Sequence, residues 1–267
     1  PRGFDYWCIH PGQGEYFDPV FIENGAHVQK QGYASDITAD LALDYLERRD
    51  RARPFCLVYQ FKAPHRPFTP AQRHADLYTD VEIPKPASYD DDYATRRIAA
   101  EAADMRFDLS LAGDYDDLPA DLDAAGRREW IYNRYTRDRY RTIAGVDENL
   151  GRVLDYLDDE GLTDNTFVIY TSDHGYFIGE HGWYDKRFMY EPCLRIPLLA
   201  RYPRFGKTGH VAEEFTVNID YAATILDLAG VAAPATVQGT SFAALIEGQS
   251  PVDWRRATYY AYYEDSW

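Results

Sequence analysis

An acid and an imidazole stand together at Asp173-His174, at the end of an apolar run that has the length of a β-strand. The run, residues 167–170, consists of β-branched and aromatic side chains and predicts a buried strand. Gly175 follows and lets the backbone turn closely, because it carries no Cβ. Ligands of open α/β sheets bind where the strands end. Asp173 and His174 are therefore candidate metal ligands, and Lys186 downstream can bring a positive charge to the same pocket.

A second polar loop also follows an apolar run. Residues 55–61 form a continuous apolar stretch of strand length, which predicts another central strand. The sequence Lys-Ala-Pro-His-Arg-Pro follows at 62–67, and its prolines restrict the backbone around His65. His65 is therefore a candidate site residue at the end of this run, with a loop histidine held by neighbouring backbone groups as the alternative.

Helices must support these two strands. Apolar residues recur every three or four positions over 128–160 and predict the longest helix, which Gly161 ends. A helix at 35–50 begins with a serine, a favoured N-cap residue, and a further helix is expected at 219–229. The apolar residues 197–201 predict another strand. Helix, short loop and strand in this order indicate an α/β fold.

Charge and cysteine content exclude several classes of protein. The net charge of −16 argues against nucleic acid as a partner, because phosphates require Lys and Arg. Residues 76–124 hold 14 acidic and 4 basic side chains and predict a long insertion, an exposed loop with one short helix near 94–104. A metal site in this acidic run is the alternative. The three cysteines form neither a disulfide framework nor a zinc motif, and no apolar run is long enough to span a membrane.

Several spaced motifs together resemble the sulfatase family of the alkaline-phosphatase-like superfamily. They are Ser-Asp-His-Gly at 172–175, Gly-Glu-His-Gly at 179–182 followed by Lys186, and the segment at 62–67. The resemblance implies an incomplete α/β domain with a mixed, mostly parallel central sheet and helices on both faces. The insertion at 76–124 is similar to that of sulfatases of the N-acetylglucosamine-6-sulfatase-like group. The chain thus resembles the C-terminal part of a sulfatase catalytic domain.

The resemblance also implies roles for individual residues. His65 would protonate the leaving oxygen, Lys186 would contact the sulfate, and Asp173 and His174 would bind a divalent cation. The family favours Ca²⁺, whereas the side chains alone leave Mg²⁺ and Zn²⁺ open, because carboxylates suit hard cations and imidazole suits zinc.

Three further side chains flank the motifs. His181, Arg187 and Arg66 are candidates for contacts with the sugar, and structural ion pairing is the alternative for each. The implied substrate is a sulfated carbohydrate, and the family implies a periplasmic or extracellular location. The sequence indicates no oligomeric state.

The nucleophile of a sulfatase is a formylglycine made from Cys or Ser in the pattern C/S-x-P-x-R, which does not occur in residues 1–267. We therefore expect a partial catalytic domain that lacks the nucleophile-bearing N-terminal part, is truncated at its C-terminus and is inactive alone. The residues at 259–267 would begin a strand that is cut off. Three functions stay open: sulfuric ester hydrolase, phosphodiesterase or phosphonate monoester hydrolase of the same superfamily, and non-catalytic glycan-binding protein with a sulfatase-like fold.

Overall fold

The computed structural model describes the chain except for residues 96–97, 108, 206–208 and 262–267. It divides into two compact units. The first unit contains Pro1–Glu160 and Ile178–Tyr184, and the second contains Gly161–Phe177 and Asp185–Trp267. Each unit is described by itself below. Among the described residues, no helix combines the length and the apolar character that crossing a bilayer requires.

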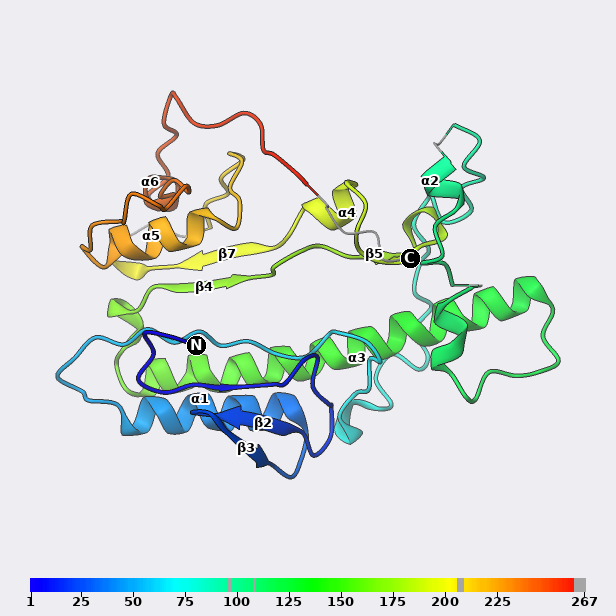
Figure 1. The fold of residues 1–267 in the computed structure, drawn as a ribbon, viewed down its shortest axis with the longest axis horizontal. Helices are drawn as coiled ribbons and strands as arrows, with labels where there is room; N and C mark the ends of the chain where they lie inside the picture. The colour runs from blue at the N-terminus through cyan, green and yellow to red at the C-terminus, as the bar shows by residue number, and fades with distance from the viewer. Residues whose placement is uncertain (96–97, 108, 206–208, 262–267) are drawn as a thin grey trace. The chain divides into compact units, whose positions relative to one another are not determined.

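Two helices that lie side by side form the frame of the first unit (Figure 1). They are α1, Ala34–Arg48, and α3, Ala124–Asp159. The predicted N-cap of the first helix is wrong by two positions, because Tyr33 is the extended cap residue and Ser35 is buried inside the helix. The first-turn carboxylate Asp36 accepts hydrogen bonds from Arg73 and from Asn149 of α3. This polar contact fixes the register of the two helices.

The long helix begins and ends as its terminal residues favour. The side chain of Asp123 accepts a hydrogen bond from the amide of Gly126, which satisfies a donor that has no partner within the helix. Gly161, just past the other end, has a φ of +66°. The prediction of a helix at 128–160 ended by this glycine is confirmed, with one more turn at the N-terminus.

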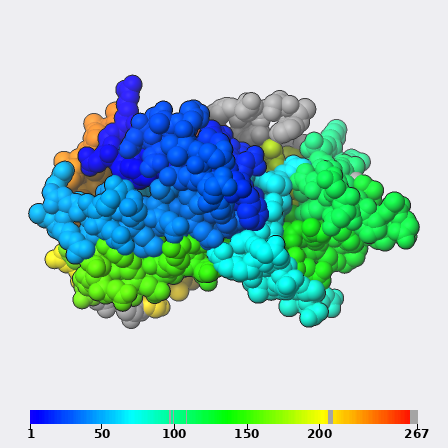
Figure 2. All heavy atoms as spheres, turned by 90° about the horizontal axis from the view of Figure 1, so that it is seen from below, coloured from blue at the N-terminus to red at the C-terminus, as the bar shows by residue number. Residues whose placement is uncertain are grey.

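The N-terminal residues of the first unit form a small antiparallel sheet. Its strands are β1, Cys8–Ile9, β2, Val20–Glu23, and β3, Ala26–Gln29, in the order β1-β2-β3. Figure 2 shows the atoms of these N-terminal residues, in blue, gathered on one face. The side chain of Phe21 is 2% exposed, so the sheet contributes to the core.

The predicted strand at 55–61 is wrong in the described part of the chain, which has no strand there. The segment nevertheless has the alternating burial of an extended chain. Phe55, Leu57 and Tyr59 pack against Leu46 and Val153 of the two long helices. The apolar run therefore buries one face, although no neighbouring strand pairs with its backbone in the described residues.

The acidic segment 76–124 is not the exposed loop that its charge predicts. The expected short helix is present as α2, Ile98–Glu101, and 3-10 turns occur just before the segment at η1, Gln72–His74, and within it at η2, Leu111–Asp114. Phe107 is fully buried and packs against Tyr132 and Tyr135 of α3. Aromatic and aliphatic side chains spaced among the acids form this core, so the prediction of an exposed loop from net charge alone was wrong.

The second unit contains a two-stranded sheet. Its strands are β4, Val168–Thr171, and β7, Leu198–Arg201, which confirm the two predicted strands. They pair antiparallel, from Val168 with Arg201 to Thr171 with Leu198. The helix–loop–strand order before β4 predicted a parallel neighbour, and none lies in the described residues. The chain reverses direction in the turns that follow the Asp173-His174 pair, so β7 runs antiparallel to β4.

Short helices complete the second unit. They are α4, Glu191–Leu194, α5, Asp220–Leu228, and α6, Ala243–Ile246, with 3-10 turns at η3, Thr163–Asn165, and η5, Pro203–Phe205. The helix predicted at 219–229 is therefore confirmed. Residues 259–261 form no strand, and the rest of the strand expected at the C-terminus lies outside the described residues.

A short hairpin contains the Gly-Glu-His-Gly motif. Strands β5, Phe177–Ile178, and β6, Tyr184–Asp185, pair with each other, and the 3-10 turn η4, Glu180–Gly182, lies between them.

Candidate active site

The turn after β4 fixes the orientation of the Asp173-His174 pair. The backbone amide of His174 donates to Asp173 Oδ1 at 3.0 Å, and Ser172 Oγ donates to the His174 carbonyl at 2.8 Å. His174 Nδ1 lies 2.7 Å from the Gly175 carbonyl oxygen. Because a carbonyl oxygen only accepts, Nδ1 carries the proton and Nε2 presents its lone pair.

The geometry of the pair is suited to a shared cation. His174 Nε2 lies 3.6 Å from Asp173 Oδ2, and the Asp173 side chain is 84% exposed. A backbone carbonyl that holds the other ring nitrogen is the usual support of a histidine ligand to a metal. The carboxylate and the imidazole can therefore offer two donors to one ion.

Two donors do not form a complete metal site. Among residues 1–95, 98–107, 109–205 and 209–261, no group of three or more His, Cys, Asp or Glu side chains is placed to hold an ion. Hard divalent cations take six or more oxygen ligands. The described residues therefore do not by themselves fit a resident cation.

The turn at Gly175 lies close against the backbone of residues 192–193, in agreement with the close turn that this glycine predicted. Its amide donates to the Cys193 carbonyl at 2.8 Å, and the Tyr176 amide donates to the Pro192 carbonyl at 2.7 Å. A Cβ at position 175 would stand 2.0 Å from the Pro192 oxygen. Only glycine allows the two backbones to approach this closely, so α4 positions the Asp173-His174 turn.

Lys186 belongs to the same unit as this turn. Its Nζ lies 5.9 Å from the ring centre of Tyr176, which comes directly after Gly175. It also lies 3.7 Å from Asp185 Oδ1, and the Lys186 side chain is 29% exposed. The ammonium is thus partly desolvated and close to the residue that follows the turn.

Asp185 pairs with two of the candidate site residues, and the sequence analysis missed it. Its side chain is 15% exposed and pairs with Arg187 as well as with Lys186. The φ of Asp185 is +75° and that of Arg187 is +130°, which are strained values for residues with side chains. The sequence signal for this ion pair was the position of an acidic residue immediately before Lys186 and Arg187. Arg187 has an ion pair here, whereas its contact with a sugar stays a prediction.

The loop of His65 belongs to the first unit. His65 Nδ1 lies 2.9 Å from the Arg66 carbonyl oxygen, and the Tyr16 hydroxyl donates to the His65 carbonyl at 2.5 Å. The guanidinium of Arg66 forms a two-fold ion pair with Asp114 of the acidic segment. Arg66 therefore has the structural ion pair that was the alternative to contact with a sugar.

His181 is also bound by the acidic segment. Its Nδ1 lies 2.7 Å from Asp91 Oδ2, and both side chains are largely buried. The Tyr93 hydroxyl donates to the His181 carbonyl at 2.5 Å, and the Trp183 ring lies beside the imidazole. The backbone of His181 has a φ of +59°. Carboxylates of the acidic segment therefore hold side chains of two separate motifs, a function that composition did not reveal.

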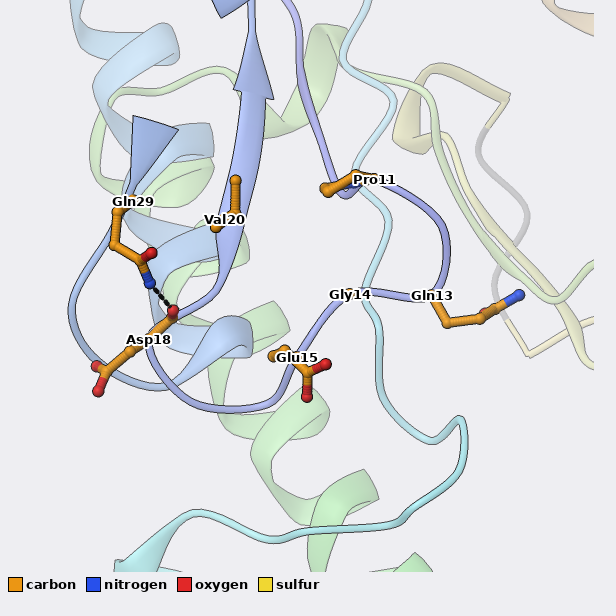
Figure 3. Close-up of a pocket in the computed structure, with 7 residues that line it drawn as sticks. All are labelled: Pro11, Gln13, Gly14, Glu15, Asp18, Val20 and Gln29. Carbon is orange, nitrogen blue, oxygen red and sulfur yellow. Dashed lines mark hydrogen bonds between the residues drawn. The ribbon is translucent and has the colours of Figure 1, made fainter. Parts of the chain in front are cut away.

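The N-terminal loops form a hollow of about 490 Å³ (Figure 3). Its polar side chains do not converge, since Glu15 and Asp18 point in different directions and Gln13 points away from both. Gln29 is occupied by a hydrogen bond to the Asp18 carbonyl. The hollow therefore lacks the convergent polar groups of a small-molecule site.

The predicted residues thus form two sets. Asp173, His174, Lys186 and Arg187 all belong to the second unit, in which Lys186 lies 5.9 Å from the ring centre of Tyr176, two residues after His174. His65 and His181 belong to the first unit. The convergence of the two sets on one substrate stays a prediction.

Comparisons with known proteins agree with these motifs. The family "N-sulphoglucosamine sulphohydrolase, C-terminal" matches residues 179–266, and "Type I phosphodiesterase / nucleotide pyrophosphatase" matches residues 118–188. An N-acetylglucosamine-6-O-sulfatase of Bacteroides thetaiotaomicron is 41% identical over 99% of this chain and 56% of its own length. The chain belongs to the sulfatase family.

A solved structure gives the same assignment for this sulfatase chain. The structure of BT4656 in complex with its substrate D-glucosamine-2-N,6-O-disulfate has a TM-score of 0.94 and 41% identity, covering 99% of this chain and 63% of that chain. An extracellular sulfatase SULF-1 homolog of Drosophila melanogaster is 27% identical over 92% of this chain and 21% of its own length.

These similarities confirm the α/β class and the sulfatase resemblance, here as a partial arrangement with small sheets. The sulfatase chain spans about half the length of the curated relative that it matches at 41% identity, 56% of that sequence. The activity of the whole protein is therefore a matter for proposal.

Proposed function

We propose that the protein containing this chain is a sulfuric ester hydrolase that removes sulfate from a sulfated amino sugar or glycan. The observation that carries the proposal is the arrangement in the second unit. A carboxylate and an imidazole with an exposed lone pair lie beside each other, and the ammonium of Lys186 lies 5.9 Å from the ring of Tyr176, two residues further along the chain. Such a set suits an anionic ester held between a cation and a positive side chain. The names of the relatives favour a 6-O-sulfated glucosamine.

Each side chain has a distinct role in this proposal. Lys186 binds a sulfate oxygen and offsets the negative charge that repels nucleophiles. His65 is the general acid, and its proton must come from Nε2, because Nδ1 is engaged with the Arg66 carbonyl. In the overall hydrolysis, sulfur gains an oxygen that comes from water, the S–O bond to the sugar breaks, and the sugar oxygen takes this proton and leaves as an alcohol. Arg187 and His181 are placed at the sugar by the proposal, in addition to their pairs with Asp185 and Asp91.

Membership of the family implies a metal ion and a formylglycine in general. In the proposal, Asp173 and His174 contribute two of the ligands, and Ca²⁺ is the ion. The ion would supply a positive charge for the sulfate oxygens. Neither a complete set of ligands in the described residues nor a C/S-x-P-x-R motif in residues 1–267 is present, and no step is assigned to them.

A phosphodiesterase or phosphonate monoester hydrolase is the second candidate. The match of the type I phosphodiesterase family to residues 118–188 favours it, since this range includes Asp173 and His174. The segment at 62–67 and the Gly-Glu-His-Gly turn favour a sulfatase. A non-catalytic glycan-binding protein is the third candidate, and it predicts binding of the sugar without turnover.

The deciding experiment uses the complete protein. Hydrolysis of glucosamine 6-sulfate is compared with hydrolysis of glucosamine 6-phosphate and of a phosphodiester at equal concentrations. A sulfatase releases sulfate at least about tenfold faster than phosphate, since the site is complementary to one transition state. Faster hydrolysis of a phosphorus ester supports the second candidate, and binding without any turnover supports the third.

The His65→Ala variant tests the assignment of the acid. Its kcat on glucosamine 6-sulfate should fall by about 100-fold or more, because the sugar alcohol is a poor leaving group without a proton donor. His27→Ala is the matched control, since His27 is exposed on β3. A His65→Ala variant with nearly full turnover would show that another group is the acid.

The location is also a proposal. We place the protein outside the cytoplasm, in the periplasm or the extracellular medium, in line with the Drosophila relative that is named an extracellular sulfatase. Cell fractionation with an antibody to this chain tests it, and recovery in the cytoplasm alone would reject it.

A further inference from the structure

Lys62 has an unusual environment for a lysine. It is 8% exposed, although lysine is almost never buried without a counter-charge. Its Nζ donates to the Gln13 carbonyl at 3.1 Å and to the Arg66 carbonyl at 3.2 Å, and lies 4.7 Å from the ring centre of Tyr16. Within the described part of the chain, no carboxylate forms an ion pair with it. Burial lowers the pKa of Lys62 although the negative charge of Glu15 partly opposes the shift, so holding this cation in place costs free energy.

The two donors around the loop act on adjacent peptide groups. Lys62 donates to the carbonyl of Arg66, which is the same oxygen that accepts from His65 Nδ1. Tyr16, which is 3% exposed, donates its hydroxyl to the carbonyl of His65 itself. The two peptide groups that follow the His65 Cα are therefore fixed by side chains that are buried.

We propose that Lys62 and Tyr16 are positioning residues that hold the His65 ring in one orientation, with Nδ1–H on the Arg66 carbonyl, so that the protonated ring donates its second proton from Nε2 and is left as the neutral Nδ1–H tautomer. This inference rests on the proposed function. The Arg66 carbonyl receives two donors, so it cannot rotate without breaking the bond to Lys62 or the bond to His65. A fixed carbonyl keeps the proton on Nδ1 and directs Nε2 toward one position. An effect of about 1 Å on that position is enough to change a rate by about 100-fold.

A neutral side chain would be sufficient if the contact served only to hold the loop in place. An ammonium donates a stronger hydrogen bond than a neutral group does. It also spans two carbonyls at once, that of Gln13 and that of Arg66, and so connects the N-terminal loop with the loop of His65. The free energy that is lost by burying the charge is therefore offset by the two hydrogen bonds that fix the position of His65.

The test compares two substrates in the complete protein. Glucosamine 6-sulfate has an alcohol leaving group and depends on a proton donor, whereas 4-nitrophenyl sulfate has an acidic phenol and depends on it little. Lys62→Met should lower kcat on the sugar sulfate by about 30-fold or more and leave the aryl sulfate within about threefold, because only the first reaction needs the acid. Tyr16→Phe should show the same selectivity with a smaller loss.

Two further variants complete the design. Lys62→Gln keeps an N–H donor without the charge and should restore part of the lost rate. Lys30→Met removes a lysine that pairs with Glu23 at the edge of the N-terminal sheet and should change neither reaction. Equal losses on both substrates would show a structural role only, and unchanged rates would remove Lys62 from the mechanism.

A measurement on the ring itself does not depend on turnover. Nitrogen NMR of His65 in the wild type should show the neutral ring protonated at Nδ1, and Lys62→Met should show a mixture of tautomers. An unchanged tautomer overturns the inference even if the protein is an active sulfatase. A wild type that hydrolyses neither sulfate but shows the predicted change in tautomer would reject the proposed function and leave the positioning contact established. If Lys62→Met does not fold, Tyr16→Phe, which removes one hydroxyl, carries the same comparison.

Discussion

The carboxylate of Asp220 gives the sharpest prediction about stability in the second unit. Asp220 is the first residue of α5 and is 0% exposed. It accepts hydrogen bonds from the backbone amides of Val217 at 2.9 Å and Thr240 at 2.8 Å. The guanidinium of Arg255 forms a two-fold ion pair with it. One carboxylate thus joins three segments that are distant in the sequence.

The contacts set the size of the effect. Removing one partner of a buried ion pair costs about 3–5 kcal/mol, but the side chain of Arg255 is 20% exposed and can turn toward water. We therefore expect Asp220→Asn, which keeps one acceptor oxygen, to lower the free energy of unfolding by about 2–3 kcal/mol. Asp220→Ala should cost about 4–5 kcal/mol, since two buried amides also lose their acceptor.

The effect should depend on pH. Burial by itself would raise the pKa of Asp220, but the hydrogen bonds from Arg255, Thr240 and Val217 outweigh it and the pKa is lowered. A carboxyl with a lowered folded pKa stabilises the protein fully above its unfolded pKa of about 3.9, and the stabilisation is lost as the pH falls through the folded value. The difference in stability between the wild type and Asp220→Asn should therefore shrink below about pH 4.

Urea unfolding at pH 7, with hydrogen exchange at the amides of Val217 and Thr240, measures the effect locally. Asp227→Asn on the same helix is the matched control, because Asp227 is exposed and its carboxylate accepts a hydrogen bond from the Ser241 hydroxyl; it should cost less than about 0.5 kcal/mol. A double-mutant cycle with Arg255→Met should give a coupling above about 1 kcal/mol. Stability of Asp220→Ala within about 0.5 kcal/mol of the wild type would refute the reasoning.

Three further outcomes follow from the site. Lys186→Ala in the complete protein should lower kcat/KM for the sulfated sugar by about 100-fold, with Lys186→Arg recovering part of it; unchanged kinetics would reject contact with the sulfate. Gly175→Ala should lower the free energy of unfolding by about 2–3 kcal/mol, because its Cβ would overlap the Pro192 carbonyl. Gly151→Ala is the control, since nothing lies within 4 Å of a Cβ at that position, and chemical denaturation of both variants measures the difference. Asp91→Asn should expose the turn around His181 to limited proteolysis, because Asp91 pairs with that imidazole. Asp90→Asn should not, because Asp90 forms its ion pair with Arg128 at the surface. Equal cleavage of both variants would contradict the role of Asp91 in holding His181.

Most helices and the chemistry of the motifs could be predicted from the sequence. The periodic apolar residues at 128–160 and the glycine after them predicted the long helix, since helical burial has a regular spacing. Residues 172–175 predicted a turn with an acid and an imidazole, and Gly175 is needed there because another backbone approaches it. These features depend on neighbours in the sequence.

Strand pairing could not be predicted in the same way. The run at 55–61 has the composition of a central strand, yet a strand is defined by hydrogen bonds to a partner, and none is present in the described residues. The antiparallel pairing of β4 with β7 depends on the path of the chain between them, which local pattern does not encode.

The sequence by itself determined the family, the helices and the chemical types of the candidate groups, because motifs and periodicity are local properties of the chain. Only the tertiary structure decided which partner each charged group has. Asp91 holds His181, Asp114 holds Arg66, and a buried ammonium lies beside the candidate acid. Partners of this kind come from distant positions, and their choice depends on which side chains lose water together when the chain packs.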